Sequence, residues 1–339
     1  MKKAKLWIAA ALLLGILIRP NAAVAGAQRA MRVWCTSVAP ALFPFLALMP
    51  LLTGPEACAA YNSLLSGPMR RLFHLPGAAA TAAVIGMIAG SPGGAIAVCR
   101  IARSGGLRAS EARRIALAVS GVSPAYLMLG VGFGLYGSMS LGLALAAIQL
   151  CIQLALLLLL RAVLPDRTDK LPALAEAPIR SDGMRGAVES VLVICGYMVL
   201  FGAIGSVVAS FAGSDVGLAM LLAADLPSGL SELAARGFPG KMLIQGVAIG
   251  FGGLCIAAQN LDALREIGVR PAEYLAVRGI AAGLFGCISG VILRAQEANF
   301  ALALEKSGLA YAFSLAVACI FAVPGLIFLS KELFLNKET

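Results

Sequence analysis

Charge is scarce in this chain. Only 13% of its 339 residues are charged and 60% are hydrophobic, whereas soluble domains carry about 25% charged residues. Apolar runs long enough to cross a bilayer recur along the whole sequence. These features exclude a soluble globular protein. They predict an integral, multi-pass membrane protein that is all-α and has the lipid bilayer as its first partner.

Side chains suited to catalysis or metal binding are equally few. The chain has one histidine, His74, and its eight cysteines include no CxxC pair. We find no phosphate-binding loop, no GxSxG motif and no ligand set with metal spacing. A serine protease inside the membrane would need its histidine there, but His74 stands at the edge of an apolar run. An aspartyl protease would need two facing aspartates, and Asp262 ends its helix. We therefore expect no enzyme, no metal site and no cofactor.

The apolar run 76–99 is interrupted by Ser91-Pro92-Gly93-Gly94. Proline disfavours helix in the residue before it, and two glycines make helix more costly. Ser91 suits an N-cap, with Pro92 at the first helical position. We therefore expect a helix, a break and a second helix. Such a break at membrane depth is tolerated only where it is buried in protein or lines a cavity.

A second interrupted run, Val216 to Ala235, contains Asp225-Leu-Pro-Ser-Gly229. Paired broken segments in the two halves of a chain are the best sequence indication of a transporter's binding site. We interpret both runs as re-entrant hairpins, entering from opposite sides in an inverted repeat. The predicted organisation is a first half at 1–160, a polar linker at 161–186 and a second half at 187–339.

About eight spanning helices are expected besides the hairpins. The first apolar run, Leu6 to Ile18, follows three lysines and could be a signal peptide. We favour a retained membrane helix extended to Ala27, because Arg19-Pro20 is awkward for cleavage. A mixed segment, Glu56 to His74, fits an interfacial amphipathic helix. The expected spans are 6–27, 33–52, 115–136, 138–160, 187–211, 241–263, 275–293 and 309–329.

The basic residues predict the orientation. With re-entrant hairpins and a cytoplasmic N-terminus, 20 of the 27 Lys and Arg residues lie inside and 7 outside. If both hairpins crossed the bilayer, the better orientation would place only 17 on one side. The hairpin arrangement therefore obeys the positive-inside rule better. Because the basic residues lie in short loops between apolar runs, we interpret the net charge of +10 as orientation signals and expect no nucleic-acid partner.

Asp225 is the one charge in the run from Val216 to Ser231. A carboxylate at the bilayer centre costs roughly 2.5–3.5 kcal/mol on insertion scales, so it is rarely found there without a role. Three roles fit it: a helix cap, a ligand for a coupling sodium ion, or the carrier of a coupling proton. The candidate solute-binding residues are Ser91, Gly93, Gly94, Ser120, Ser123, Asp225, Ser228, Gly229, Gly252, Gly253, Gln259 and Asn260.

Several of these residues have structural alternatives. Ser120 and Ser123 would bond to backbone within their own helix. Gly252 and Gly253 would permit close helix packing. Gln259 and Asn260 fit either a pore-lining or an interfacial position.

Six stretches carry a resemblance to a known family. The chain resembles the sporulation integral membrane proteins of the YlbJ type, which carry nucleoside-recognition (Gate) domains. The resemblance implies a fold similar to concentrative nucleoside transporters and a role in moving a small solute during endospore formation, with dipicolinate as the leading candidate. The stretches are Pro40-Ala-Leu-Phe-Pro-Phe45, Gly90-Ser-Pro-Gly-Gly-Ala95, Ser120-Gly-Val-Ser-Pro124, Asp225-Leu-Pro-Ser-Gly229, Gly250-Phe-Gly-Gly-Leu-Cys-Ile-Ala-Ala-Gln259 and Tyr274-Leu-Ala-Val-Arg278.

The sequence thus favours a transporter of a small anionic solute, because a half-helix N-terminus suits a carboxylate or a phosphate. Two alternatives stay open: a structural or assembly protein of sporulation, and a transporter of a nucleoside-like solute. A homo-oligomer is compatible with the sequence but is not indicated by it.

Overall fold

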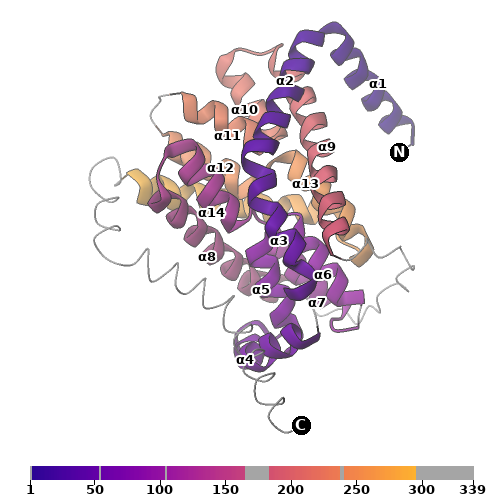
Figure 1. Ribbon diagram of the computed structural model, residues 1–339, viewed down its shortest axis with the longest axis vertical. Coiled ribbons are helices and arrows are strands. Elements are labelled where there is room, and N and C mark those ends of the chain that lie inside the picture. Colours follow the sequence, from indigo (N-terminus) through magenta and orange to yellow (C-terminus); the bar gives the residue numbers. More distant parts are fainter. Residues whose placement is uncertain (1, 53–54, 104, 165–182, 237–239, 295–339) are drawn as a thin grey trace.

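The computed structural model describes residues 2–52, 55–103, 105–164, 183–236 and 240–294. Every regular element in these ranges is helical, as predicted, and the helices form one elongated bundle (Figure 1). The predicted span 309–329 and most of the predicted linker lie outside the described residues. Five of the described helices are long and apolar enough to cross a membrane: Pro20–Leu48, Met139–Val163, Met184–Ala209, Lys241–Ile267 and Pro271–Val291.

The N-terminal helices divide at a different place from the one expected. Helix α1 (Lys2–Ile18) ends at Arg19, whose backbone is non-helical, and α2 (Pro20–Val33) begins with proline at its first position. The chain then stays helical through η1 (Trp34–Val38) and α3 (Ala39–Leu52). The predicted first span to residue 27 was therefore wrong. Proline lacks the N–H that a continuing helix would need, but it fits the start of a new one.

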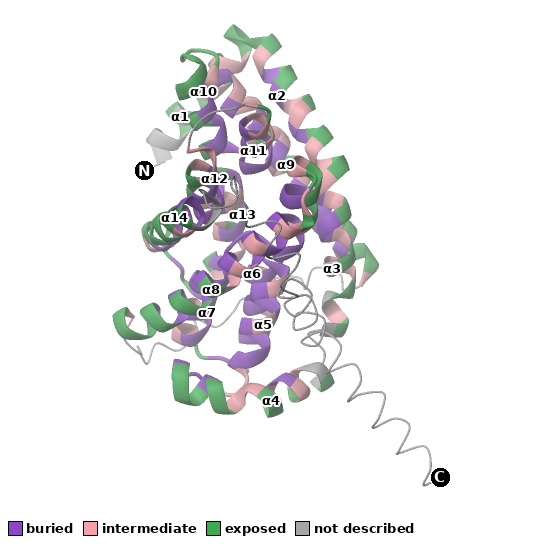
Figure 2. Cartoon of the chain, turned by 90° about the vertical axis from the view of Figure 1, so that its left-hand side faces the viewer, coloured by how far each residue is buried: buried purple, intermediate pink, exposed green. Residues whose placement is uncertain are grey.

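Helix α4 (Pro55–Phe73) lies across the lower end of the molecule (Figure 2). Two arginines from other helices hold its last turn. Arg114 Nη2 donates to the carbonyl of Phe73 at 2.9 Å, and Arg161 Nη1 donates to that of Leu72 at 2.7 Å. Cations at a helix C-terminus satisfy its open carbonyls and its negative dipole end. The transverse course of α4 agrees with the predicted interfacial helix.

The first interrupted run forms the predicted pair of short helices. Helix α5 (Ala79–Ala89) and α6 (Gly93–Arg103) pack against each other. Glycine at position 94 lets the two helices pack this closely, because a Cβ there would lie 2.7 Å from the carbonyl oxygen of Gly86. We call the turn between the helices, Gly90 to Pro92, tip 1.

The second interrupted run forms a hairpin of the same kind. Helices α10 (Ser214–Ala224) and α11 (Leu226–Ala235) pack together, and Asp225 to Pro227 form tip 2. Gly229 closes it, because a Cβ there would lie 2.6 Å from the Cα of Leu222. Figure 1 shows α5 and α6 in the lower half of the bundle, and α10 and α11 in the upper half. The two tips thus approach the middle from opposite ends.

Each hairpin is followed by a helix that is itself broken. Helix α7 (Ala109–Val119) ends at break 1, residues 120–123, before the π-helical η2 (Tyr126–Leu135). Helix α12 (Lys241–Phe251) ends at break 2, Gly252 and Gly253, before α13 (Gly253–Leu264).

The glycines of break 2 have φ angles of 88° and 81°, in the left-handed region that favours glycine. No atom lies within 3.7 Å of a Cβ added at Gly252. The pair therefore breaks the helix, and Gly253 also packs closely, since a Cβ added there would lie 3.3 Å from the backbone nitrogen of Leu226.

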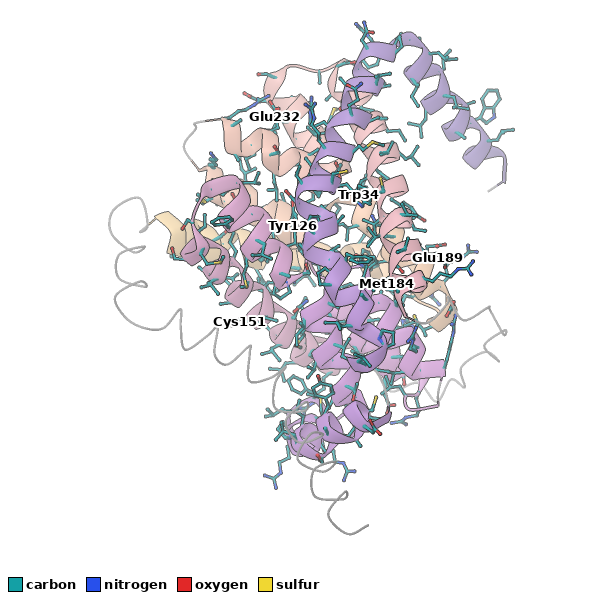
Figure 3. All side chains as sticks on the ribbon, viewed as in Figure 1. Trp34, Tyr126, Cys151, Met184, Glu189 and Glu232 are labelled. Carbon is teal, nitrogen blue, oxygen red and sulfur yellow. The ribbon has the colours of Figure 1, made fainter. Side chains whose placement is uncertain are left out.

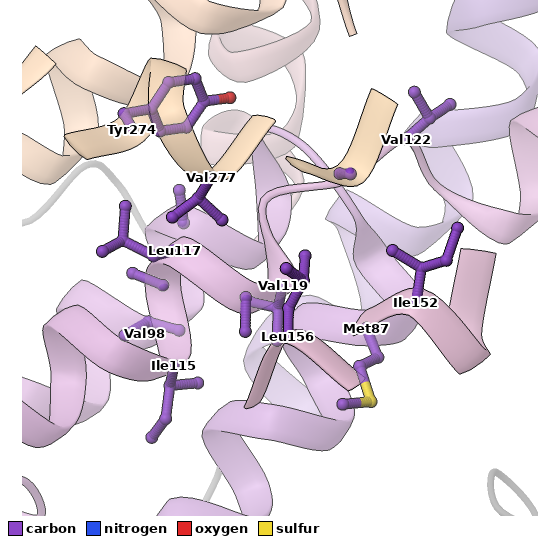
Figure 4. Close-up of a cluster of buried hydrophobic side chains, with 14 of the residues drawn as sticks. Met87, Val98, Ile115, Leu117, Val119, Val122, Ile152, Leu156, Tyr274 and Val277 are labelled. Atoms are coloured by element: carbon purple, nitrogen blue, oxygen red, sulfur yellow. The ribbon is translucent and has the colours of Figure 1, made fainter. Parts of the chain in front are cut away.

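Long helices enclose these broken elements. Helix α8 (Met139–Val163) packs on η2, α9 (Met184–Ala209) on α10 and α14 (Pro271–Arg294) on α12. Small residues allow the closest contacts, as in other membrane bundles: a Cβ on Gly26 of α2 would lie 2.3 Å from the carbonyl oxygen of Gly202 on α9. Figure 4 shows the buried side chains of α5, α6, α7, α8 and α14 meeting in one apolar cluster.

Ion pairs join the two halves near the loops predicted to be cytoplasmic. Arg103 of α6 pairs with Glu266 of η3 (Arg265–Ile267), and Arg113 of α7 pairs with Glu273 of α14. The charge count needs two corrections. Arg29 and Arg32 lie within α2 and not in an outer loop, and Arg278 is buried. Without these three residues the count becomes 19 inside and 5 outside, so the positive-inside orientation is unchanged.

Candidate solute site

Both tips and both broken helices meet at one cavity, which we call the central cavity. Tip 1 contributes Ser91 and Pro92, and tip 2 contributes Asp225 and Pro227. Break 1 and the π-helix after it, helix α13, and the opposing helices η1, α3 and α9 supply the rest of the wall. Those residues are Val38, Leu42, Val122, Ser123, Tyr126, Ile194, Met198, Cys255, Ile256 and Gln259.

Tip 1 is fixed by hydrogen bonds to both halves of the chain. The Ser91 N–H donates to the carbonyl of Gly121 in break 1 at 2.8 Å. The Ser91 hydroxyl accepts from Asn260 Nδ2 at 2.8 Å, and the same amide nitrogen donates to the Tyr274 hydroxyl at 2.7 Å. Helix α6 begins only at Gly93. The predicted N-cap at Ser91, with Pro92 as first helical residue, is therefore replaced by a bridge from tip 1 to α13 and α14.

Tip 2 places a carboxylate in the cavity wall. Asp225 is fully buried and stands at the N-cap position of α11. Its Oδ2 accepts a hydrogen bond from the Ser228 hydroxyl, and its Oδ1 has no hydrogen-bond partner. A buried polar atom without a partner costs about 1–3 kcal/mol. Asp225 thus occupies the cap position, but half of its carboxylate remains available to a ligand in the cavity.

Each tip also packs against the break of its own half. A Cβ on Gly90 of tip 1 would lie 2.4 Å from the Cα of Ser123 in break 1. A Cβ on Gly253 of break 2 would lie 3.3 Å from the backbone nitrogen of Leu226 in tip 2. Because glycine allows these close approaches, the two halves build the cavity from the same kind of contact.

The serines of break 1 bond to backbone, as the structural alternative predicted. Ser120 Oγ donates to the carbonyl of Ala116, four residues earlier. Ser123 Oγ accepts from the N–H of Tyr126 at 3.1 Å, which caps the helix after the break. Ser123 also lines the central cavity, whereas Ser120 does not.

The field in the cavity is shaped by helix ends. Helices α6, α11 and α13 begin beside it, while α5 and α10 end at the two tips. A helix start is a positive dipole end that favours anions, and a helix end is negative. The negative end of α12 is already occupied: buried Arg278 donates Nε to the carbonyl of Phe251 at 3.4 Å and Nη2 to that of Gly250. Arg278 therefore neutralises carbonyls that would otherwise weaken the attraction for an anion.

The other predicted site residues lie around the cavity. Gly93 is in the wall of a smaller void beside tip 1. Gly94 and Gly229 face their own hairpins and not the cavity. Ser228 reaches the cavity through Asp225, and Asn260 through Ser91. Gln259 lines it directly, while Gly252 and Gly253 shape break 2 without lining it.

Most apolar residues of the cavity wall were not predicted from sequence, and four residues of the site with polar or reactive side chains were also missed. Tyr126 and Cys255 line the cavity, and nothing in their local sequence marks them. Tyr274 and Arg278 act from α14, one turn apart on the same helix. Arg278 had a usable signal, because a charge within an apolar membrane segment is rarely without a role. Figure 3 places Tyr126 between Glu232 in the upper part of the bundle and Met184 further down.

The size of the cavity limits what it holds in this conformation. Its volume is about 40 Å³. A buried water needs roughly 10–15 Å³ on this measure, so there is room for a few water molecules. A solute with an aromatic ring would need the walls to separate.

Comparison with known proteins places these features in context. The sequence is 24% identical, over 318 residues, to the "Sporulation integral membrane protein YlbJ" of Bacillus subtilis (strain 168), covering 80% of this chain and 78% of that protein. The resemblance to YlbJ-type proteins is confirmed. Because the alignment leaves out only a fifth of this chain, and both hairpins lie well inside it, the alignment includes both hairpins. No family model matches the sequence, so the Gate domain stays a prediction, and no solved structure matches it.

Proposed function

We propose that this chain is a membrane transporter of a small anionic solute, acting in endospore formation, with dipicolinate as the leading candidate. One observation carries the proposal: two hairpin tips and two broken helices, far apart in sequence, line one buried cavity. Irregular backbone at membrane depth is expected only where it is enclosed by protein or lines a cavity. The sporulation context comes from the name of the relative YlbJ.

An inverted repeat is part of the proposal. The order of hairpin, broken helix and long helix occurs as α5–α6, α7–η2, α8, and again as α10–α11, α12–α13, α14. Each tip packs on the break that follows it, and the hairpins come from opposite ends of the bundle (Figure 1). This arrangement supports two halves of opposite orientation around the central cavity, as in many secondary transporters.

An anionic solute requires that Asp225 be neutralised. Two like charges 4 Å apart repel by about 4 kcal/mol at an effective dielectric constant of 20. Oδ1 of Asp225 has no partner to offset that repulsion. A proton or a sodium ion carried with the solute would neutralise the Asp225 carboxylate and so remove the repulsion. We therefore propose that the transporter couples its solute to a proton or sodium gradient through Asp225.

A nucleoside-like solute is the second candidate, and the unpaired Oδ1 of Asp225 favours it. The unpaired carboxylate oxygen of Asp225, in a cavity that Gln259 also lines, could accept hydrogen bonds from sugar hydroxyls. A nucleoside carries no charge that Asp225 would repel. A structural or assembly role would leave the unpaired carboxylate without a function.

Flux measurements on the purified protein in lipid vesicles would test the proposal. We expect uptake of radiolabelled dipicolinate above that of protein-free vesicles, increased by an imposed pH or sodium gradient. Uptake of uridine with no uptake of dipicolinate would move the assignment to the nucleoside-like alternative. Absence of flux for both solutes would contradict transport and favour the structural role.

The proposed topology predicts which sites are reached from which side. Cysteines replacing His74 and Gly105, both exposed and flanking the first hairpin, should be labelled from the cytoplasmic side. A cysteine at Ser214, at the base of the second hairpin, should be labelled from the other side. Impermeant maleimide applied to sealed vesicles of known orientation measures this. Labelling of positions 74 and 105 from opposite faces would rule out a re-entrant first hairpin.

A further inference from the structure

A second cavity adjoins the central one and opens towards the loops predicted to be cytoplasmic. It lies between α9, α6 and α13 and has a volume of about 50 Å³. We call it the vestibule. Its wall consists of Pro92, Ile96, Ser190, Val193, Ile194, Tyr197, Gln259, Asp262 and Ala263.

Three residues, Pro92, Ile194 and Gln259, line both the vestibule and the central cavity. They come from tip 1, α9 and α13, so the partition between the two spaces is made of single side chains. Beyond this partition the wall carries the polar side chains of Ser190 and Asp262. Asp262 is exposed at the far end, so the vestibule reaches solvent there.

The position of the vestibule relates it to one membrane face. On α9 its lining runs from Ser190, six residues after the start of that helix at Met184, to Tyr197. On α13 it extends from Gln259 to Ala263, towards the end of that helix. The neighbouring chain carries Arg265 and Arg270, which belong to the basic set that the positive-inside rule places in the cytoplasm.

We infer that the vestibule is the aqueous route between the cytoplasm and the central cavity, and that Pro92, Ile194 and Gln259 form its gate. The void beside tip 1 offers no comparable route. It has about 10 Å³ and is lined by Leu42, Leu46, Ala89, Ser91, Pro92 and Gly93, and roughly 10–15 Å³ is needed for one water. The inference deepens the proposed transport function and rests on it.

Cys255 provides a natural reporter of access, because its side chain lines the central cavity and is otherwise buried. The impermeant, anionic thiol reagent 2-sulfonatoethyl methanethiosulfonate would be applied to either face of sealed vesicles containing the full chain. Labelling of each cysteine would be followed by peptide mass spectrometry. We expect Cys255 to react from the cytoplasmic face, slowly, as the gate opens.

Two neighbouring substitutions on α9 make a matched pair. Both side chains are exposed, Val193 to 37% and Leu192 to 57%, but Val193 lines the vestibule and Leu192 does not. Val193→Trp should abolish most of the Cys255 labelling from the cytoplasmic face, and Leu192→Trp should leave it unchanged. Ala263→Trp changes the opposite wall of the vestibule and should also abolish most of the Cys255 labelling. Agreement between the two variants would show that a local folding defect in one of them is not the cause.

Equal labelling of Cys255 in both α9 variants would overturn the inference. So would labelling only from the opposite face, or no labelling from either face when Cys255 reacts after denaturation. The readout needs no solute, so it separates the two proposals. Flux with an unreactive Cys255 would overturn the vestibule alone. Vestibule-dependent labelling without flux would leave the route in place and overturn transport.

Discussion

Replacing Asp225 with asparagine is expected to uncouple uptake from the driving gradient while leaving the protein folded. Asparagine keeps the shape of the side chain and an oxygen that can accept from Ser228, which bonds to the carboxylate. It removes the only titratable or cation-binding group of tip 2. One coupled proton can support about tenfold accumulation per pH unit. In Asp225→Asn vesicles we expect the solute only to equilibrate across the membrane.

The matched control is Asp215→Asn. Asp215 lies in the same hairpin, with its side chain 97% exposed and within 3.5 Å of Arg236. Its neutralisation should leave both uptake and ion dependence unchanged. Uphill accumulation by Asp225→Asn with the original ion dependence would show that Asp225 only caps α11.

The hairpin glycines give the second large expected effect. Gly94→Ala and Gly229→Ala should each destabilise the protein by about 1–3 kcal/mol, the usual cost of overpacking a core, and should abolish flux. In both cases the new methyl group would lie within 2.7 Å of backbone atoms on the opposing helix of the hairpin. Because backbone atoms cannot move away as a flexible side chain can, the two helices of the hairpin must separate and the tip must shift.

Gly196→Ala is the control for this pair. Gly196 lies within α9 with no atom within 4 Å of an added Cβ, so alanine should raise stability by up to about 1 kcal/mol through helix propensity. Thermal unfolding in detergent, followed by fluorescence, compares the three variants. Unchanged melting and flux in Gly94→Ala and Gly229→Ala would contradict the tight hairpins.

The sequence predicted the hairpins because their signals are local. Proline and glycine at Ser91–Gly94 and at Asp225–Gly229 interrupt apolar runs, and the backbone obeys those interruptions. Local signals could not predict that Tyr126 and Cys255 line the same cavity as the two tips. Their position there depends on how separate helices pack, and neither residue differs from ordinary core residues in its local pattern.

Two helix boundaries also have local signals. Arg19-Pro20 is awkward for signal cleavage, but its proline also suits the start of a helix. Gly252 and Gly253 interrupt an apolar run, and Gly253 also lets break 2 pack closely against tip 2. Proline at a first helical position and glycine at positive φ mark helix boundaries wherever they occur. Used consistently, that rule places both boundaries correctly.

The ion pairs between Arg103 and Glu266 and between Arg113 and Glu273 are only partly covered, with side chains 20–32% exposed. Such pairs weaken as dissolved salt increases, because the Debye length falls from about 10 Å at 0.1 M to 3 Å at 1 M. They fasten the first hairpin and α7 to the second half at the end where the vestibule opens. Ionic strength at that end of the molecule would therefore control how firmly the two halves are held together, with concentrated salt favouring the state in which they separate.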